Sequence, residues 1–498
     1  MSPSDVRDRL GDRFRLLSGA RRGLERHQTL RHAVQWSYEL LNDDERFVLH
    51  HCSVFADGFD LAAITHVCER FDEYTVLDLV DSLVRKSLVT AQQSGDHNRY
   101  GLLETIRQFA EDQLGTAGTI SEVRDRHARY YCTQVIAYRE LEHGPRQRVA
   151  TDWVEAEFAN MRTAFRWAID GHDLDTATSI AVHTTMMSFY LQRFEPVGWA
   201  EELLPAATAA EVRQLPLLYL SATGCAYTGR PDVAVGYAQA ALALETDRRY
   251  ESIEPGFASF LEGNGHSLAG RFDRFLEICG ALVTQTGSAR VLGLCGQTYS
   301  LAVVGRDQEA TAVADEALAA TRAFGSPSWI AWALYAYGTA FSGSDPTRAL
   351  GVLREGLIYA KEHRMPVWEA NIAFLAAGLE AVHGNRQRGL EMFDTTIESF
   401  QHAGAIAGTA ATLGSLATIF DRFEQPDIAA TLYGATTDYG HVSALPSIPG
   451  LVDHLRTILG STRFDECVAA GAAMELADAV RYARAQIKLL RSELAMPS

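Results

Sequence analysis

The chain has 498 residues, a formal net charge of −18 and 47% hydrophobic residues. Its length exceeds what one hydrophobic core supports and predicts two to four domains of a soluble globular protein. The acidic balance argues against a protein that coats nucleic acid or an anionic membrane surface.

The cysteines and the N-terminus bear on the cell compartment. The seven cysteines are scattered, and none belongs to a Cys-x-x-Cys pair that would indicate zinc or a disulfide framework. The first residues, Met1 to Arg9, are charged and lack the apolar core of a secretion signal. We therefore expect reduced thiols and a cytoplasmic protein.

The first predicted elements follow the order of a winged helix-turn-helix. Apolar residues recur at helical spacing over Thr29–Leu41. Asn42 and Glu45 resemble a capping box that opens the next helix, and Asp60 can cap a third. Thr75 can cap a fourth helix, whose apolar residues fall on one face.

A short β-hairpin and a further helix complete this pattern. Leu88–Ala91 and Arg99–Leu103 are predicted as the wing strands, joined by a turn at 94–96. Glu104–Leu114 is predicted as the closing helix. Residues 29–116 are therefore predicted to form one winged helix-turn-helix domain with one small β-hairpin.

After connecting helices predicted over 117–170, residues 171–436 contain a divergent repeat. Turns of similar chemistry recur at intervals of 35–41 residues, at Arg193, Gly229-Arg230, Gly270-Arg271, Gly305-Arg306, Ser344-Asp345 and Gly384-Asn385. Small residues seven apart follow three of these turns, in the pairs Ala234/Ala241, Ala310/Ala317 and Ala349/Gly356. Gly389 and Thr396 keep this spacing, whereas Phe275 breaks it.

This period and spacing are typical of tetratricopeptide repeats. We predict six or seven helical hairpins that stack into a superhelix with a concave inner surface. Residues 437–498 would close it, chiefly through a capping helix at Glu475–Leu490. The predicted fold is thus mainly α, a winged helix-turn-helix followed by a tetratricopeptide-like α-solenoid.

Four short segments occur in an order and spacing that resemble a known family: Arg13–Leu17, His27–Arg31, Ser53–Phe59 and Leu102–Arg107. They resemble the region after the ATPase core in STAND-type bacterial regulators, which are LuxR/AfsR-like and contain an NB-ARC domain. Glu155–Arg162 resembles the entry of that family into its repeats. The resemblance implies a regulatory, signal-sensing protein, in which residues 1–28 are the remnant of a helical subdomain.

The phosphate-binding loop of that family is missing. Such a loop needs a Gly-rich turn ending in Gly-Lys-Ser/Thr, so that backbone N–H groups and one lysine hold the phosphates. The only lysines are Lys86, Lys361 and Lys488, and none follows a glycine. Leu103 occupies the place where related nucleotide switches have the histidine of Met-His-Asp, and we interpret it as a core leucine. We therefore expect no bound nucleotide and no ATPase activity.

The winged helix need not read DNA. The candidate reading helix, Thr75–Lys86, carries Asp78 and Asp81, with positive charge only at Arg85 and Lys86. A reading helix instead needs Arg, Lys, Asn or Gln that face the groove. We expect a protein-contact role for this helix, and direct DNA binding stays open as the alternative.

Several other motifs have ordinary structural explanations. Gly265–Ala269 is one residue short of a nucleophile elbow and continues a repeat helix. His50 and His51 would point in different directions, so they form no metal site. The uncharged stretch Ala403–Phe420 is rich in Gly, Ser, Thr and Ala and is interpreted as a packed helix, not a membrane span.

Aromatic residues of the repeats could line a ligand groove, but at helical spacing they are more often hairpin core. The residues concerned are Phe189, Tyr190, Trp199, Trp329, Trp332, Tyr335 and Tyr337. The sequence therefore indicates no catalytic, cofactor-binding or metal-binding residue.

We interpret the chain as a non-catalytic regulatory module whose superhelix binds a protein or a small inducer. One alternative is a transcription factor whose winged helix binds DNA. Another is an accessory subunit of an ATPase or nucleotide cyclase supplied by another chain.

Overall fold

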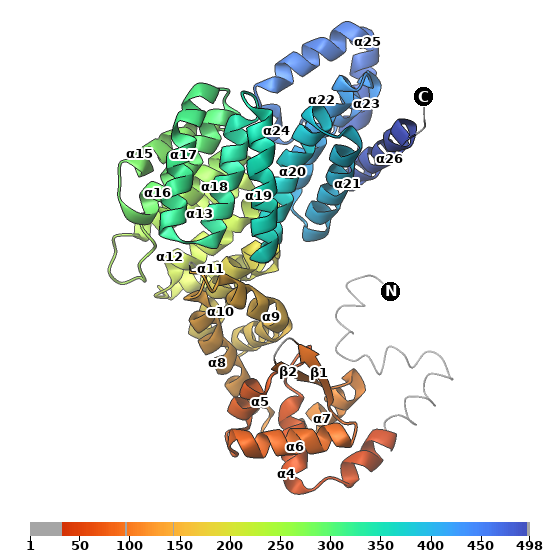
Figure 1. Cartoon of the computed structure of the whole chain (residues 1–498). Helices are drawn as coiled ribbons and strands as arrows, with labels where there is room; N and C mark the ends of the chain where they lie inside the picture. The colour runs from red at the N-terminus through yellow and green to blue at the C-terminus, as the bar shows by residue number, and fades with distance from the viewer. Residues whose placement is uncertain (1–31, 95–96, 143, 496–498) are drawn as a thin grey trace. The chain divides into compact units, whose positions relative to one another are not determined.

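The computed structural model describes residues 32–94, 97–142 and 144–495, which divide into two compact units (Figure 1). The first unit extends to Gln134 and also contains Glu157–Ala177. The second contains Val135–Ala156 and the chain from Thr178 onward. The predicted remnant at 1–28, with the motifs at Arg13–Leu17 and most of His27–Arg31, lies outside the described residues.

The first unit has the element order of a winged helix-turn-helix. Residues 32–39 are helical, and further helices with a two-stranded sheet follow: α4 (Asp43–Cys52), α5 (Leu61–Cys68), α6 (Glu73–Arg85), β1 (Thr90–Ser94), β2 (His97–Gly101) and α7 (Glu104–Thr116). β1 and β2 pair antiparallel, with Thr90 opposite Gly101. The predicted winged helix-turn-helix is confirmed.

Local hydrogen bonds explain where these helices begin. Asn42 and Glu45 form both bonds of a capping box at α4, and Asp60 accepts a hydrogen bond from the Ala63 N–H at the start of α5, as predicted. The predicted cap of α6 is wrong, because Asp72 takes that role. Its carboxylate accepts from the Thr75 N–H, so Thr75 already lies in the first turn.

The predicted wing strands are displaced by about two residues. Leu88 and Val89 are buried, but their N–H groups bond back to the Leu83 carbonyl and so finish the C-terminus of α6. The strands instead run up to the turn through Gln92 and Gln93, which are exposed. Because successive exposed residues of the wing are polar, its sequence lacks the alternation of apolar and polar residues that indicates a strand.

Two long helices continue from the first unit into the second. They are α8 (Ile120–Arg139) and α9 (Gln147–Asp170). The division between the units falls after Gln134 in α8, after Ala156 in α9 and after Ala177 in the helix that follows.

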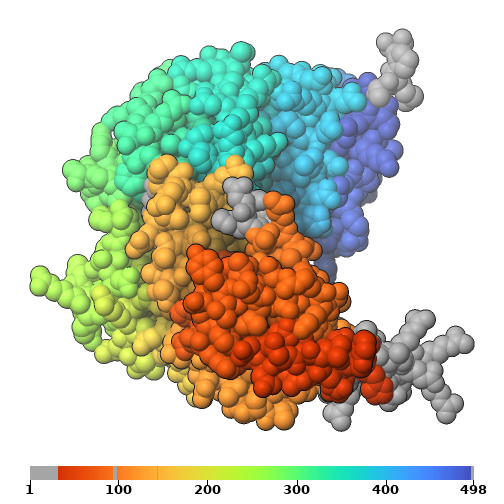
Figure 2. Space-filling view, turned by 60° about the horizontal axis from the view of Figure 1, so that its bottom comes forward, coloured from red at the N-terminus to blue at the C-terminus, as the bar shows by residue number. Residues whose placement is uncertain are grey.

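Seven helical hairpins make up the repeat region among the described residues. Their helices pair in chain order as α10 (Leu174–Ser188) with α11 (Glu195–Ala209), α12 (Leu215–Ala222) with α13 (Pro231–Leu244), α14 (Phe257–Leu268) with α15 (Phe272–Val283), α16 (Gly287–Val303) with α17 (Asp307–Phe324), α18 (Pro327–Phe341) with α19 (Pro346–Glu362), α20 (Pro366–His383) with α21 (Arg386–Ala403), and α22 (Ile406–Arg422) with α23 (Pro426–Gly434). Short 3₁₀ turns, η3 (Phe189–Leu191) and η4 (Thr223–Ala226), extend α10 and α12. In the space-filling view the green, teal and blue hairpins follow one another without a gap (Figure 2).

Every predicted turn lies between the two helices of a hairpin. The small residues predicted at helix crossings are buried, and Ala234, Ala310 and Ala349 have no exposed surface. Phe275, which breaks the pattern, is also buried, because Gly263 leaves room for its ring. A Cβ atom on Gly263 would lie 2.4 Å from Phe275 Cδ2.

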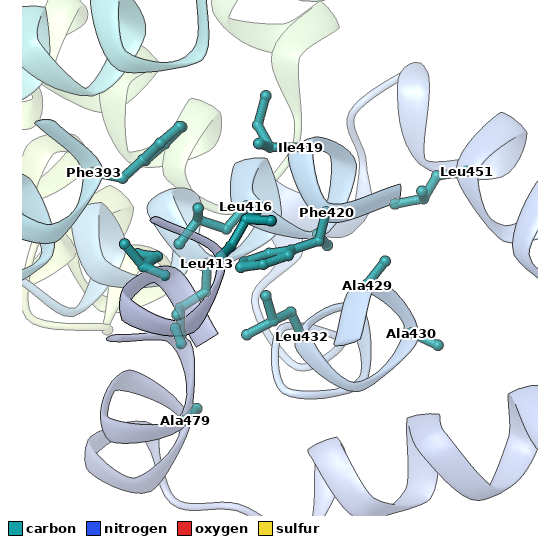
Figure 3. Close-up of a cluster of buried hydrophobic side chains, with 14 of the residues drawn as sticks. Phe393, Leu413, Leu416, Ile419, Phe420, Ala429, Ala430, Leu432, Leu451 and Ala479 are labelled. Carbon is teal, nitrogen blue, oxygen red and sulfur yellow. The ribbon is translucent and has the colours of Figure 1, made fainter. Parts of the chain in front are cut away.

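The C-terminal segment closes the last hairpins. It contains α24 (Gly440–Ser443), α25 (Ser447–Ala472, interrupted at Gly460) and α26 (Leu476–Ala495). α26 packs on α21, α22 and α23, where Ala479 joins a buried cluster with Leu413, Phe420 and Leu432 (Figure 3). The predicted closing helix at Glu475–Leu490 therefore exists and extends five residues further.

Candidate ligand-binding site

A cavity of about 460 Å³ lies inside the second unit and is walled by the first helices of successive hairpins. α20 contributes a stripe that includes Asn371, Phe374 and Gly378. α22 contributes a second stripe, Gly408, Ala411, Ser415, Thr418 and Arg422. Intervals of three and four residues place such a stripe on one helix face, so the concave surface of the superhelix forms the cavity wall.

Contacts between early and late hairpins close this concave surface. The Ala407 N–H donates to the Tyr227 carbonyl at 3.2 Å, and Ser399 Oγ donates to Gln192 Oε1 at 3.2 Å. The turn at Gly270, with φ +81°, approaches α24 so closely that a Cβ atom there would lie 2.4 Å from the Gly440 oxygen. These contacts join early and late hairpins around a cavity that stays partly open to solvent.

Aromatic rings form much of the wall. The rings of Phe194 and Tyr227 stack at 5.9 Å, and those of Tyr299 and Tyr335 stack at 5.8 Å between centroids. Burial raises the pKa of Tyr227 and of Tyr299 to about 12, so both hydroxyls remain protonated at neutral pH. Among the described residues that line the cavity there is no Asp or Glu.

The polar groups in the cavity fall into two sets. Thr339, Ser342 and Asn371 each donate one hydrogen bond to a carbonyl of their own helix. Ser415, Thr418 and Arg422 have no hydrogen-bond or ion-pair partner among the described residues. Gln192 is only 7% exposed, and its Nε2 also lacks a partner within the described chain.

The aromatic residues named from the sequence mostly belong to the core. Trp199, Trp329, Tyr190 and Tyr337 are buried, and Phe189 and Trp332 are half-buried, while only Tyr335 of this set lines the cavity. Sequence reasoning missed Tyr227, Tyr299 and Phe374. Tyr299 and Tyr335 lie 36 residues apart (335 − 299 = 36), about one repeat period, and that interval was the available signal.

The weaker catalytic and metal motifs do not assemble. Gly265–Ala269 extends along and just past α14, so the strand that a nucleophile elbow requires does not precede Ser267, which is buried. His50 contacts the Tyr38 hydroxyl at 2.9 Å, and His51 contacts the Phe47 carbonyl at 2.7 Å. A search of the described residues found no group of three or more potential metal ligands.

The reading helix of the winged helix offers little positive charge. Lys86 Nζ lies 2.6 Å from both carboxylate oxygens of the buried Glu45, to which Ser82 also donates. Burial alone would raise the pKa of Glu45, but the bonds from Lys86, Ser82 and the Asn42 N–H outweigh it and lower the pKa. With Lys86 engaged, the exposed surface of α6 presents Asp78, Asp81 and Arg85.

Two of the family-like motifs meet in a polar cluster of the first unit. Arg99 forms an ion pair with Glu157 and donates to the carbonyls of Asp57 and Gly58. Asn160 donates to the Gly58 carbonyl at 2.8 Å and accepts from the Ala56 N–H at 2.7 Å. The segment Ser53–Phe59 is therefore held by α9, which explains why both motifs occur together.

Leu103 is not a core residue, so this prediction is wrong. Its side chain is 60% exposed, and it is the residue that precedes α7. Its carbonyl accepts the first helical hydrogen bonds, from Ile106 and Arg107. With an extended backbone at this cap position, its side chain faces solvent.

The uncharged stretch Ala403–Phe420 has a different explanation from a membrane span. None of the described helices is both long and apolar enough to cross a bilayer. One face of α22 lines the cavity, and another packs in the core through Leu413, Leu416 and Phe420. The stretch is uncharged because one face borders a mostly apolar cavity and the other lies in the hydrophobic core.

Comparison with known proteins identifies the domain type of the first unit and several relatives that match part of the chain. Residues 41–115 match the model of a winged helix-turn-helix domain. A protein of Mycobacterium tuberculosis and its counterpart in Mycobacterium bovis, both named as HTH-type transcriptional regulators, are 38% identical over 184 residues. The match covers 36% of this chain and 21% of theirs, so the chain spans about a fifth of the length of these relatives. An uncharacterized protein of M. tuberculosis is 37% identical over 134 residues, 26% of this chain and 34% of that protein.

Two solved structures resemble the chain more loosely. One is a STAND protein with a tetratricopeptide repeat sensor from Pyrococcus horikoshii, with a TM-score of 0.44 and 15% identity over 91% of this chain and 66% of that one. The other is a Rap protein in complex with Competence and Sporulation Factor, with a TM-score of 0.42 and 15% identity over 73% of this chain and 99% of that one.

Proposed function

We propose that this chain is a non-catalytic, signal-sensing module of a transcriptional regulator in the cytoplasm, of the LuxR/AfsR-like STAND type. In this proposal residues 29–116 form the contact module and 117–170 connect it to the repeats. Residues 171–436 bind the signal, a small inducer or a protein segment, and 437–498 cap the superhelix.

One observation carries the proposal: the superhelix surrounds a partly open cavity of about 460 Å³ whose wall retains polar groups without partners among the described residues. Cavities of roughly 300–1,000 Å³ are the usual size of small-molecule sites. A structural repeat array needs no such cavity, because stacking of its hairpins already buries the apolar faces.

The winged helix fits a protein-contact role better than DNA reading. Its exposed surface includes Trp36 at 67%, Leu40 at 62% and Tyr74 at 82% exposure. Large exposed apolar side chains are typical of protein contacts. A DNA-reading surface would instead present several cations, and Lys86 is held by Glu45.

A cell experiment tests the proposal. A strain lacking the gene is complemented with the wild-type chain, with Ala411→Leu, which places three carbons in the cavity, or with Ala319→Leu, a matched change at an exposed residue of α17. We expect the transcripts that depend on the gene to be restored by the wild type and Ala319→Leu only. Restoration by a folded Ala411→Leu protein would contradict signal sensing through the cavity.

DNA binding is tested separately with footprinting. We expect only weak, salt-sensitive binding to duplex DNA, because phosphate contacts alone are largely lost at about 150 mM salt. A sequence-specific footprint at that salt concentration would promote the alternative of a DNA-binding transcription factor.

A further inference from the structure

We propose that the cavity binds an amphipathic molecule with a single anionic head group and one extended apolar body. The inference rests on the proposed sensing function and names the chemical class of its signal. Its basis is the distribution of charge, hydroxyl groups and unpaired donors along α22 and the facing helices.

The head-group site lies at the C-terminal part of α22. Ser415, Thr418 and Arg422 follow one another at intervals of three and four residues and line the cavity. All three lack partners among the described residues. Gly378 on α20 faces this site without crowding it, since a Cβ atom there would be 3.8 Å from Ser415 Oγ. Two hydroxyls and a guanidinium are donors suited to a carboxylate or phosphate.

The charged side chains that line the cavity favour an anionic ligand. Arg422 is exposed at the rim, and His383 is also exposed there. The described lining residues include no carboxylate, although the chain carries 63 acidic side chains in total. The C-terminus of α22 opposes an anion through its helix dipole, but that is a partial charge against the full charge of Arg422.

The body of the ligand would lie toward the other end of α22. There the wall is formed by Phe194, Phe374 and Ala411, and Phe194 and Phe374 pack against a cluster with Phe400. Gly408 and Arg422 are 14 residues apart, which corresponds to about 21 Å of helix. The cavity is therefore long and mostly apolar, and all but one of the free donors named above lie along the C-terminal half of α22.

A peptide in the cavity is disfavoured by the same distribution. A peptide backbone carries donors and acceptors along its whole length and needs partners for each when buried. Among the other lining residues, Thr339, Ser342 and Asn371 already bond to their own helices. Gln192 is 7% exposed, and its Nε2 has no partner in the described chain. It adds one donor beside Phe194. One donor at that end suits a ligand oxygen but not a peptide chain.

Titration calorimetry of the full chain tests the class with four probes of equal chain length: dodecanoate, dodecyl phosphate, dodecan-1-ol and dodecylamine, each below its micellar concentration. We expect at least one of the anions to bind one per chain, at least about tenfold more tightly than the alcohol. The amine should bind most weakly. Comparison of the two anions distinguishes a carboxylate from a phosphate head group.

Three variants locate the binding. Arg422→Gln should weaken the anion about tenfold or more and leave the alcohol nearly unchanged. Arg388→Gln removes the same charge from an exposed residue of α21 outside the cavity lining and should change neither. Ala411→Leu should weaken every probe, which separates the cavity from the exposed apolar side chains of the first unit.

The inference is overturned if none of the four probes binds, if the alcohol binds as tightly as the anions, or if Arg422→Gln has no effect on the anions. Failure of the inference differs from failure of the function. If no probe binds but cells with Ala411→Leu lose regulation, the proposal of signal sensing through the cavity stands and only the amphipathic class of ligand is rejected. Probe binding with normal regulation in those cells would preserve the chemistry and reject the proposed function.

Discussion

The carboxylate clusters of the first unit and the cavity wall of the second unit differ in how fully their polar groups are bonded. In the first unit, Glu45 is bonded by Asn42, Ser82 and Lys86, and Glu157 is bonded by Arg99, Tyr131 and Asn160. In the second, the cavity wall leaves several donors without a partner in the described chain. Satisfied networks hold one conformation, whereas open donors cost free energy unless a ligand or water meets them. The bonded clusters therefore hold their parts of the first unit in place, whereas the cavity wall has donors available to a ligand or water.

The largest expected effect on stability is that of Glu157→Ala in the first unit. Glu157 is 3% exposed and accepts from three donors, so its removal leaves buried donors without their acceptor. We expect a loss of about 3–5 kcal/mol in the free energy of unfolding, measured by urea denaturation. Glu155→Ala, two residues earlier, breaks only a half-exposed pair with Arg364 and should cost less than about 1 kcal/mol. Equal losses of unfolding free energy in the two variants would mean that the cluster around Glu157 does not hold α9 in place.

A smaller effect is expected where backbone geometry holds the same motif. Gly58 has φ +94°, and a Cβ atom there would lie 2.7 Å from the Tyr100 oxygen. Gly58→Ala should therefore cost about 2–3 kcal/mol through left-handed strain and the close contact. Gly118→Ala has φ +75° but open space around it, so it measures the strain alone, about 1–2 kcal/mol. If the two variants unfold at the same urea concentration, the approach of Ser53–Phe59 to β2 is unimportant for stability.

The corresponding test of the superhelix is Ala310→Leu. Ala310 has no exposed surface and lies in the cluster between α17, α18 and α19, so three added carbons should overpack that crossing. The expected cost is about 1–3 kcal/mol, read from the thermal transition. Ala319→Leu on the exposed side of the same helix should stay within about 0.5 kcal/mol of the wild type. An unchanged transition for Ala310→Leu would place the repeat register elsewhere.

The fold was largely predictable because its local signals are strong. The capping residues Asn42, Glu45 and Asp60 act within one helical turn, and the repeat turns carry glycines with positive φ such as Gly229 and Gly305. The wing strands were misplaced because Gln92 and Gln93 alternate with nothing apolar. The cap of α6 was predicted at Thr75, whereas Asp72, whose side chain can also accept a backbone bond, takes that role.

The cavity was not predictable for a physical reason. Ala411, Ser415 and Leu416 all read as residues of a packed helix, because periodicity reports that a face is shielded from charge and not what lies against it. Whether a face meets another helix or an empty space depends on how the superhelix curves. That curvature is fixed by contacts between segments far apart in the chain, such as Gln192 with Ser399.

The last and smallest expected effect concerns how the stability of the first unit depends on pH. Burial lowers the pKa of His127 from its ordinary value of 6.5 to about 3, and the residue is 1% exposed beside Phe55 and Tyr131. Below pH 6.5 the unfolded chain binds a proton that the folded chain excludes, so stability falls as the pH falls. His127→Phe removes this titration while keeping a ring.

Between pH 7.5 and 5.5 the wild type should lose about 1.4 kcal/mol more of its unfolding free energy than His127→Phe does. Urea denaturation at both pH values measures the difference, and hydrogen exchange over α4–α7 shows whether the loss belongs to the first unit. Burial also lowers the pKa of His50 and His51 to about 4, so part of the pH dependence should survive in the variant. Equal losses in both proteins would show that His127 is accessible to protons in the folded state, and the first unit would then be less rigid than its hydrogen-bond networks imply.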